Sequence, residues 1–257
     1  MLMSTDPKSA EAIAKMRLAG KLAAATLEMI GEHVKPGITA EQLDKLCHDF
    51  IVDNGGKPAC LGYNNYPNTT CISVNHVVCH GIPKNKKLKN GDMLNIDLVV
   101  EKEGYHGDTS KMFFAGKPSI LAKRLVAVTQ ESLYLGIREV KPGATLGDIG
   151  AVIDQYARSH GFSVVEDFCG HGIGLKMHEE PQVLHYGRRG TGQILTPGMT
   201  FTIEPILNAG KKEVKILPDQ WTAVTKDHQL SAQWEHTLLV TDTAFEVLTL
   251  RAEETII

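Results

Sequence analysis

Several signals that would place this sequence in a broad class are missing from it. No stretch approaches the roughly 18 consecutive apolar residues of a membrane span, so we expect no transmembrane helix and no membrane partner. Residues 1–16 contain no basic segment followed by an apolar one, which argues against a signal peptide. The five cysteines form no CxxC pair, so we expect neither disulfides nor a thiolate zinc site. A reducing, cytoplasmic location fits these absences.

Charge of one sign and several familiar catalytic signatures are also lacking. A net charge of −3 gives no broad attraction to nucleic acid, and we expect no DNA partner. The absence of a GxSxG elbow, a Walker A loop and an HExxH pair argues against the usual serine hydrolases, P-loop proteins and zincins. One basic run has two interpretations, a solvated loop, which is the simpler one, or a weak transient contact with ribosomal RNA: Lys84, Lys86, Lys87 and Lys89.

The chain does contain the periodic patterns of an ordinary globular protein, with 42% hydrophobic and 22% charged residues. Helical spacing and capping residues predict four helices, at about 9–33, 39–54, 119–140 and 145–160. Strand-like runs are predicted at 93–100, 105–114, 199–207, 221–225, 234–240 and 245–250. No low-complexity linker separates the two halves of the chain.

The sequence repeats itself weakly. Residues 34–39 (VKPGIT) resemble residues 140–145 (VKPGAT) at an offset of 106, and HGI recurs at 80–82 and 171–173. The pattern Leu-x-x-Gly followed by an acid recurs at 88–97 and 195–204, an offset of 107. Each copy reads as helices, an HGI loop and strands. We therefore expect a pseudo-symmetric α+β domain in which Asp97 and Glu204 occupy equivalent positions.

Two aspartates stand out in the first half. If the loop of the predicted hairpin is Lys102-Glu103, then Asp97 and Asp108 lie directly opposite each other on one face. Their Cβ atoms would be about 4.5–5.5 Å apart. At an effective dielectric constant of 20, two negative charges about 5 Å apart repel by about 3 kcal/mol. A shared proton or a bound cation would have to offset that repulsion.

The second half supplies comparable groups. Glu204 ends a strand-like alternation before Pro205, which keeps it extended, and Glu235 begins an apolar strand. His171 lies between glycines, so it can approach a crowded centre. Taken singly, an acid in a strand usually faces solvent and a histidine between glycines is usually a loop residue. Together, four carboxylates and an imidazole suit a pair of divalent ions such as Mn²⁺, Fe²⁺ or Co²⁺.

Several segments closely resemble methionine aminopeptidases of type I, in their short bacterial form. The resemblance covers nearly the whole chain, from residue 11 to residue 251, and its most specific parts are CLGYNNYP (60–67), VNHVVCHGIP (74–83), NIDLVVEKEGYHGDTSKMF (95–113), CGHGIG (169–174), MHEEPQVLHY (177–186), PGMTFTIEP (197–205) and SAQWEHT (231–237). It implies the pseudo-two-fold "pita-bread" fold of the creatinase and aminopeptidase type, a curved, mainly antiparallel sheet covered by helices. We expect one catalytic domain over 1–257, with halves at about 10–115 and 119–250.

The resemblance also implies roles for individual residues. It places two divalent metal ions (Fe²⁺, Mn²⁺ or Co²⁺, with Zn²⁺ as a further candidate) on Asp97, Asp108, His171, Glu204 and Glu235. It places a site for Na⁺ or K⁺ at Asn75, Val77 and Ser231. The substrate-binding residues would be Cys60, Tyr63, Tyr66, Cys71, His80, Met177, His178 and Trp221. Many relatives have phenylalanine at position 177, so the methionine there puts the shape of the pocket in question, although a thioether packs adaptably.

The implied reaction is metal-assisted hydrolysis that removes the N-terminal methionine from nascent polypeptides when the second residue is small. Two metals about 3.5–4 Å apart would share a water and lower its pKa. Glu204 would accept and donate the proton, His178 would stabilise the oxyanion, and His80 would contact the substrate backbone. We expect a monomer. The alternatives are a proline-specific peptidase of the same fold, and a non-enzymatic binding protein, in which ligands would be lost.

Overall fold

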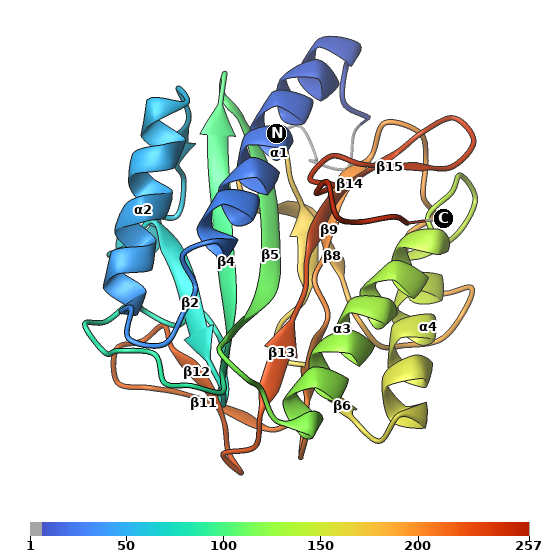
Figure 1. Ribbon diagram of the computed structural model, residues 1–257. Coiled ribbons are helices and arrows are strands. Elements are labelled where there is room, and N and C mark those ends of the chain that lie inside the picture. The colour runs from blue at the N-terminus through green and yellow to red at the C-terminus, as the bar shows by residue number, and fades with distance from the viewer. Residues whose placement is uncertain (1–6, 257) are drawn as a thin grey trace.

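The computed structural model describes residues 7–256, so residues 1–6 of the expected domain and of the signal-peptide analysis, together with Ile257, lie outside it (Figure 1). The described chain contains four α-helices, α1 (Ala10–Gly31), α2 (Ala40–Asp53), α3 (Ile120–Arg138) and α4 (Leu146–Ser159), and a 3₁₀ turn at Tyr63–Asn65. None of these helices is long and apolar enough to cross a membrane.

The predicted helix starts are confirmed by their capping bonds. Ser9 and Ser119 each accept a hydrogen bond from the backbone N–H three residues on. Thr39 and Thr145 each form a reciprocal capping box with the residue three positions later. α4 ends before Gly161, whose φ of 77° is the left-handed conformation that glycine adopts at helix ends.

The strands form four antiparallel sheets. The first joins β1 (Lys57–Pro58), β4 (Asp92–Lys102), β2 (Thr70–Val74) and β5 (Tyr105–Ala115). The largest has the order β15 (Phe245–Val247), β14 (His236–Val240), β9 (Thr200–Ile203), β7 (Gly170–Gly172) and β8 (Glu179–Val183). The two smaller sheets have the orders β13 (Ser231–Gln233), β10 (Ile206–Asn208), β6 (Ser163–Val164), and β11 (Val214–Ile216), β12 (Ala223–Thr225), β3 (Val77–Cys79).

The two halves repeat one arrangement. α1 and α2 pack on the strands of the first half, and α3 and α4 lie over those of the second (Figure 1). An isolated bridge joins Thr39 to Lys87, and its counterpart joins Thr145 to Ile194. The amides of Leu88 and Leu195 donate at 2.8 Å to equivalent carbonyls ahead of α2 and α4. In each half, these bonds join the start of the second helix to the segment that leads to Asp97 or Glu204.

The hairpin register differs from the predicted one. Asp97 pairs with Ser110, and Asp108 pairs with Val99, so the two aspartates are diagonal neighbours on one face and not directly opposite. The turn is Glu103-Gly104, one residue later than expected. Both turn residues have positive φ, 52° and 81°, as a two-residue hairpin of type I′ requires, and Gly104 adopts this without strain. Diagonal pairs are separated by roughly 7–8 Å at Cα, so the expected Cβ distance was too short.

Three other expectations need correction. The predicted strand 199–207 is interrupted between β9 and β10 at Glu204-Pro205, and the predicted strand 234–240 begins only at His236. Pro205 has no N–H to donate, so the ladder between β9 and its neighbours stops at Glu204. The second HGI segment is not a loop: His171 lies within β7, whereas His80 follows β3 with φ of 53°. The two HGI segments are therefore not structurally equivalent.

Candidate metal centre

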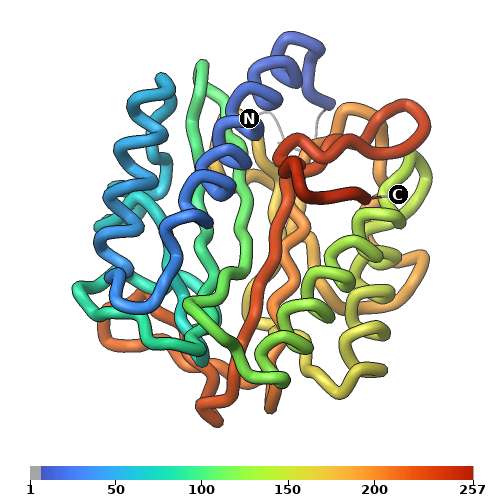
Figure 2. The backbone as a smooth tube through the Cα atoms, viewed as in Figure 1, coloured from blue at the N-terminus to red at the C-terminus, as the bar shows by residue number. Residues whose placement is uncertain are grey.

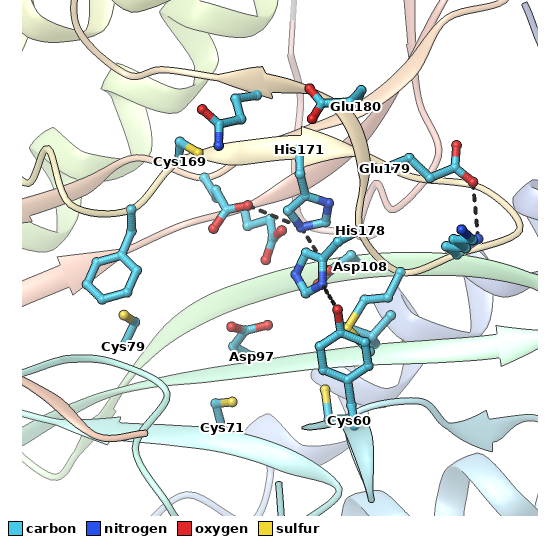
Figure 3. Close-up of a pocket in the computed structure, with 18 of the residues that line it drawn as sticks. Cys60, Cys71, Cys79, Asp97, Asp108, Cys169, His171, His178, Glu179 and Glu180 are labelled. Carbon is cyan, nitrogen blue, oxygen red and sulfur yellow. Dashed lines mark hydrogen bonds and ion pairs between the residues drawn. The ribbon is translucent and has the colours of Figure 1, made fainter. Parts of the chain in front are cut away.

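The β4–β5 hairpin brings the first two carboxylates to one face. Asp97 and Asp108 both line a cavity of about 1830 Å³ that lies against this hairpin (Figure 3). Asp108 is 4% exposed, and its Oδ1 atom is buried without a hydrogen-bond partner among the described residues. A buried carboxylate oxygen without a donor is unfavourable, so this atom calls for a proton or a cation.

His171 reaches the same centre from β7. A Cβ at Gly170 or Gly172 would collide with a backbone oxygen of a neighbouring strand, so only glycines allow β7 to lie this close. His171 Nδ1 lies 2.9 Å from the carbonyl of Gly172, which can only accept, so Nδ1 carries the ring proton. Its Nε2 lone pair consequently faces the carboxylates, as metal ligation requires (Figure 3).

Glu204 lies at the break between β9 and β10, where the ladder no longer holds its backbone. The Glu204 N–H donates instead to Nε2 of His185 at 3.1 Å. Thr202 donates its hydroxyl to Glu204 Oε1 at 2.8 Å and accepts the N–H of His171 at 3.0 Å. One hydroxyl thereby fixes two of the predicted ligands relative to each other.

Glu235 lies at the second break, between β13 and β14. It forms an isolated bridge with Ser110, to whose carbonyl it donates its N–H at 3.2 Å. The Glu235 side chain is buried at 2% exposure. Asp108, His171 and Glu235 each offer one ligand atom, and these atoms lie within 4.8 Å of one another.

The distances within the cluster fit a cation better than hydrogen bonds. His171 Nε2 is 3.6 Å from Asp108 Oδ2 and 3.6 Å from Glu204 Oε1, too far for a hydrogen bond to either. A lone pair that faces two carboxylates is repelled by both unless positive charge lies between them. The donor set of carboxylate oxygens and one imidazole nitrogen suits divalent ions of the first transition row.

Burial shifts the pKa of every group in the cluster toward its neutral form. It raises the pKa of Asp97 to about 7 and that of Glu204 to about 8. The pKa values of Asp108 and Glu235 rise well above their ordinary range through burial first and then through neighbouring carboxylates. Burial, with a smaller contribution from His178, lowers the pKa of His171 to about 3. Without a cation the cluster would therefore hold protons.

Two further histidines border the cluster. The ring of His178 lies 4.2 Å from that of His171, and its Nδ1 is 2.7 Å from the hydroxyl of Tyr63 (Figure 3). Burial and then the charge of His178 lower the pKa of His80 to about 4, so His80 is neutral near pH 7. His80 packs edge-on against Phe168 and Trp221.

An apolar pocket adjoins the cluster. Its buried members are Cys60, Tyr66, Cys71, Val99 and Met177, and Ala59, Tyr63, Ile82 and Trp221 pack against them. Tyr66 is fixed because its hydroxyl lies 3.1 Å from the carbonyls of both Thr70 and Gly81, and its ring meets Trp221 edge-on at 5.0 Å. Six of the eight residues predicted to bind the substrate thus lie together beside the carboxylates, and the other two are His80 and His178.

Comparison with known proteins assigns the chain to a family. The sequence profile of metallopeptidase family M24 matches residues 14–242. The chain belongs to family M24. It is 57% identical over 256 residues to methionine aminopeptidase of Escherichia coli strain K12, covering 99% of this chain and 97% of that protein. The crystal structure of methionine aminopeptidase from Rickettsia prowazekii superposes with a TM-score of 0.95 at 50% identity, covering 96% of this chain and all of that one.

A more distant M24 structure shares the fold alone. Prolidase from Pyrococcus furiosus has a TM-score of 0.77 at 21% identity, over 97% of this chain and 66% of that chain. These matches and the antiparallel sheets covered by helices confirm the predicted α+β "pita-bread" fold.

The residues predicted to bind a monovalent cation lie around the starts of β3 and β13. Asn75 has φ of 57°, and its carbonyl accepts the N–H of Ser231 at 2.9 Å. The hydroxyl of Ser231 is buried and has no partner among residues 7–256. Val77 begins β3, two residues after Asn75. Asn75 and Ser231 are thus adjacent.

Sequence reasoning missed several residues of this M24 site. Phe168 and Gln233 line the cavity, and Gln233 Nε2 lies 3.4 Å from Glu204 Oε2. Lys8 pairs with Glu179, next to His178, and so closes one side of the cavity with the start of the chain. His185 is buried, and its Nε2 accepts the backbone N–H of Glu204. A signal existed for His185 and Glu179, which lie within the quoted segment 177–186, and for Gln233, which lies within 231–237. Lys8 and Phe168 lie outside every quoted segment.

Proposed function

We propose that this chain is a methionine aminopeptidase that hydrolyses the bond after an N-terminal methionine when the second residue is small. The observation that carries this function is that one cavity is lined both by the five proposed donors and by an apolar wall that contains Cys60, Tyr66 and Met177. A likeness to methionine aminopeptidases over almost the full chain supports it.

The proposed ligands of two divalent ions are Asp97, Asp108, His171, Glu204 and Glu235. The unpartnered Asp108 Oδ1 atom and the Nε2 lone pair of His171, which faces the carboxylates, support this assignment. When bound, the ions would supply Lewis acidity and a water of lowered pKa. The choice among Fe²⁺, Mn²⁺, Co²⁺ and Zn²⁺ is left to metal analysis.

The protein's own groups would then move protons and bind the developing charge. Glu204 can accept a proton at Oε2, because Oε1 accepts a short hydrogen bond from Thr202 at 2.8 Å whereas Oε2 has only the longer contact from Gln233 Nε2 at 3.4 Å. If the Tyr63 hydroxyl donates a hydrogen bond to His178 Nδ1, the single ring proton of the neutral imidazole is on Nε2. Nε2 is then a hydrogen-bond donor for the oxyanion. Tyr63 would thus position His178 as well as line the pocket. His80, neutral and left-handed in φ, would contact the substrate backbone.

The methionine side chain would occupy the pocket formed by Cys60, Tyr63, Tyr66, Cys71, Met177 and Trp221. Aromatic and sulfur-containing walls are polarizable and suit a thioether. Met177 is 7% exposed and places a flexible side chain where many relatives have the rigid ring of phenylalanine. The pocket should therefore adapt more readily to analogues of the N-terminal methionine side chain.

Further parts of the proposal concern binding partners and location. Asn75, Val77 and Ser231 would bind Na⁺ or K⁺, supported by the unpartnered Ser231 hydroxyl. Action on nascent chains in a reducing cytoplasm agrees with five cysteines that are all unpaired. The chain would act as a monomer. Lys84 of the basic run approaches Asp219 at 3.7 Å, which favours a solvated loop there over a ribosome contact. The chain would be one catalytic domain with halves at about 10–115 and 119–250.

A peptide series with metal-stripped protein tests the function. Activity on Met-Ala-Ser should be absent after chelation and return with Mn²⁺ or Co²⁺. A bulky second residue would displace the scissile carbonyl, so kcat/KM for Met-Lys-Ser should be about 10²-fold lower than for Met-Ala-Ser. Equal cleavage of both would contradict the small-residue rule. Faster cleavage of an X-Pro peptide would indicate a proline-specific peptidase, and turnover by metal-free protein would contradict the metal mechanism.

A further inference from the structure

The segment after β15 contacts both halves of the chain, at Thr109 in β5 through Arg251 and at Tyr134 in α3 through Glu254. Figure 2 shows this dark red segment crossing in front of the strands toward α3. Arg251 lies at its middle and is buried at 1% exposure, although it carries a charge. The Glu254 side chain, also almost fully buried, pairs with it at 2.7 Å and accepts the hydroxyl of Tyr134 on α3. A buried ion pair of this kind is costly unless most of its donors are bonded. Nη1 and Nη2 of Arg251 donate to Thr109 and Glu254, and Nε has no hydrogen-bond partner among the described residues.

One arm of Arg251 reaches the first half. Its Nη1 donates to the hydroxyl oxygen of Thr109 at 2.8 Å. That hydroxyl in turn donates to the backbone carbonyl of Glu235 at 2.8 Å. Thr109 follows Asp108 in β5, and Glu235 lies at the break before β14. A single buried hydroxyl, oriented by Arg251, therefore links two of the proposed ligand positions from opposite halves.

A second contact of residues 249–254 leads to Asp108 in the first half. The hydroxyl oxygen of Thr249 accepts the N–H of Thr237 at 3.0 Å. Thr237 then exchanges two bonds with the backbone of Asp108: it accepts the Asp108 N–H at 3.0 Å and donates to the Asp108 carbonyl at 2.8 Å. Residues 249–254 thus reach Asp108 through Thr237 and Glu235 through Thr109.

We propose that residues 249–254 form a clamp that sets the separation of Asp108 and Glu235, with Arg251 and Thr109 as its positioning residues. The inference rests on the proposed metal-ligand assignment. Glu235 needs such support because it stands between strands, with one isolated bridge to Ser110. Metal–ligand distances are tolerant only to about 0.2 Å, so a small drift of the Glu235 backbone would weaken metal binding. Loss of a group that orients a ligand typically costs about 10–100-fold in metal affinity.

Thr109→Val is the informative variant, because it keeps the shape of the side chain and removes the hydroxyl. Thr109→Ser restores the hydroxyl and should bind metal like the wild type. The matched control is Thr129→Val in α3, which likewise removes a fully buried hydroxyl that donates to a carbonyl at 2.8 Å. Titration calorimetry of metal-stripped protein with Mn²⁺ measures affinity, and urea unfolding of the metal-free form measures the general cost of each change.

We expect Thr109→Val to bind Mn²⁺ about 10–100-fold more weakly than wild type, with Thr129→Val and Thr109→Ser close to wild type. Wild-type affinity in Thr109→Val would overturn the clamp. So would an equal loss of affinity in Thr129→Val, because general destabilisation would then explain both. Failure of the wild-type protein to bind Mn²⁺ would instead contradict the proposed metal function itself.

Arg251→Lys tests whether the tail contributes. Lysine keeps a positive charge for Glu254 but lacks the forked second arm that reaches Thr109. Its Mn²⁺ affinity should fall toward that of Thr109→Val, and Thr109→Val should weaken binding little further in the Arg251→Lys background. Wild-type affinity in Arg251→Lys would show that the hydroxyl acts without the tail and would overturn the clamp.

Discussion

The four carboxylates reach the centre in two different ways. Asp97 and Asp108 lie inside one continuous ladder that pairs every residue from Asp92 to Lys102, so backbone bonds fix their positions. Glu204 and Glu235 lie where strands stop, and side chains from distant residues hold their backbones. A regular ladder distributes its support over many bonds, whereas a break depends on one or two. Second-half positions should therefore be more sensitive to the loss of a single contact.

The largest effect should come from the carboxylates themselves, one from each half. Glu204→Gln should lower kcat by about 10²–10⁴-fold, because a carboxamide cannot accept the proton. Asp97→Asn should lose activity mainly through weaker metal binding. Saturating Mn²⁺ should therefore recover part of the activity of Asp97→Asn but not that of Glu204→Gln. Full recovery of Glu204→Gln would show that this residue acts only as a ligand.

The next prediction concerns single supporting contacts. His185→Leu removes the acceptor for the Glu204 N–H and should weaken Mn²⁺ binding about 10–100-fold. His185→Gln places an amide oxygen near the Nε2 position and should recover most of that loss. The first-half comparison is Ser110→Ala, opposite Asp97, which removes a buried hydroxyl without a partner among the described residues and leaves the ladder bonds in place. Comparable losses in Ser110→Ala and His185→Leu would remove the contrast between the halves.

A property common to both halves predicts a pH dependence of the metal-free protein. The pKa values of Asp97 and Glu204 are raised to about 7 and about 8, well above their unfolded values, because both groups are buried. The folded state then binds protons more tightly, so stability falls as pH rises through this range. Below about pH 6.5 buried histidines of lowered pKa, such as His185, act in the opposite direction.

Urea midpoints of metal-stripped protein between about pH 6.5 and 8.5 measure this effect. Asp97→Asn should reduce the slope, and saturating Mn²⁺ should abolish it because a cation replaces the protons. A stability that rises over this window would contradict the assignment of raised pKa values to the two carboxyl groups.

The smallest predicted effect concerns the capping boxes, which the two halves share. Thr39→Ala and Thr145→Ala each remove a capping box at the start of an equivalent helix. Each should cost about 1 kcal/mol of unfolding free energy. Thermal or urea unfolding of the two variants should give similar losses. A loss confined to one variant would show that the two capping boxes share their geometry but do not contribute equally to stability.

Local patterns explain what the sequence could predict. The four helices follow from apolar spacing and capping residues such as Thr39 and Thr145, because these signals act within one turn. The faces of β4 and β5 follow from alternation. Their register did not, because it depends on the turn at Glu103-Gly104, and the glutamate there adopts a positive φ that its residue type does not favour.

Local reasoning covered the strand breaks at Glu204 and Glu235 only in part. Pro205 is a local signal for the first break, yet both glutamates were placed in continuous predicted strands, at 199–207 and 234–240. The residue that bonds the backbone at each break is distant in the sequence. For Glu204 that partner is His185, and for Glu235 it is Thr109. The identity of the donor set followed from the resemblance, while its convergence in space is a property of tertiary packing.

The exposed connection at Gly116 and Lys117, between β5 and α3, has a practical consequence. Cutting the chain there would give two fragments, one with two of the proposed donors and the other with three. Each fragment would lack part of the proposed donor set, while Arg251 of the second fragment could bond Thr109 of the first and Thr237 could bond the backbone of Asp108. The protein is thus a candidate for a split reporter, in which peptide cleavage signals that two fused partners have met.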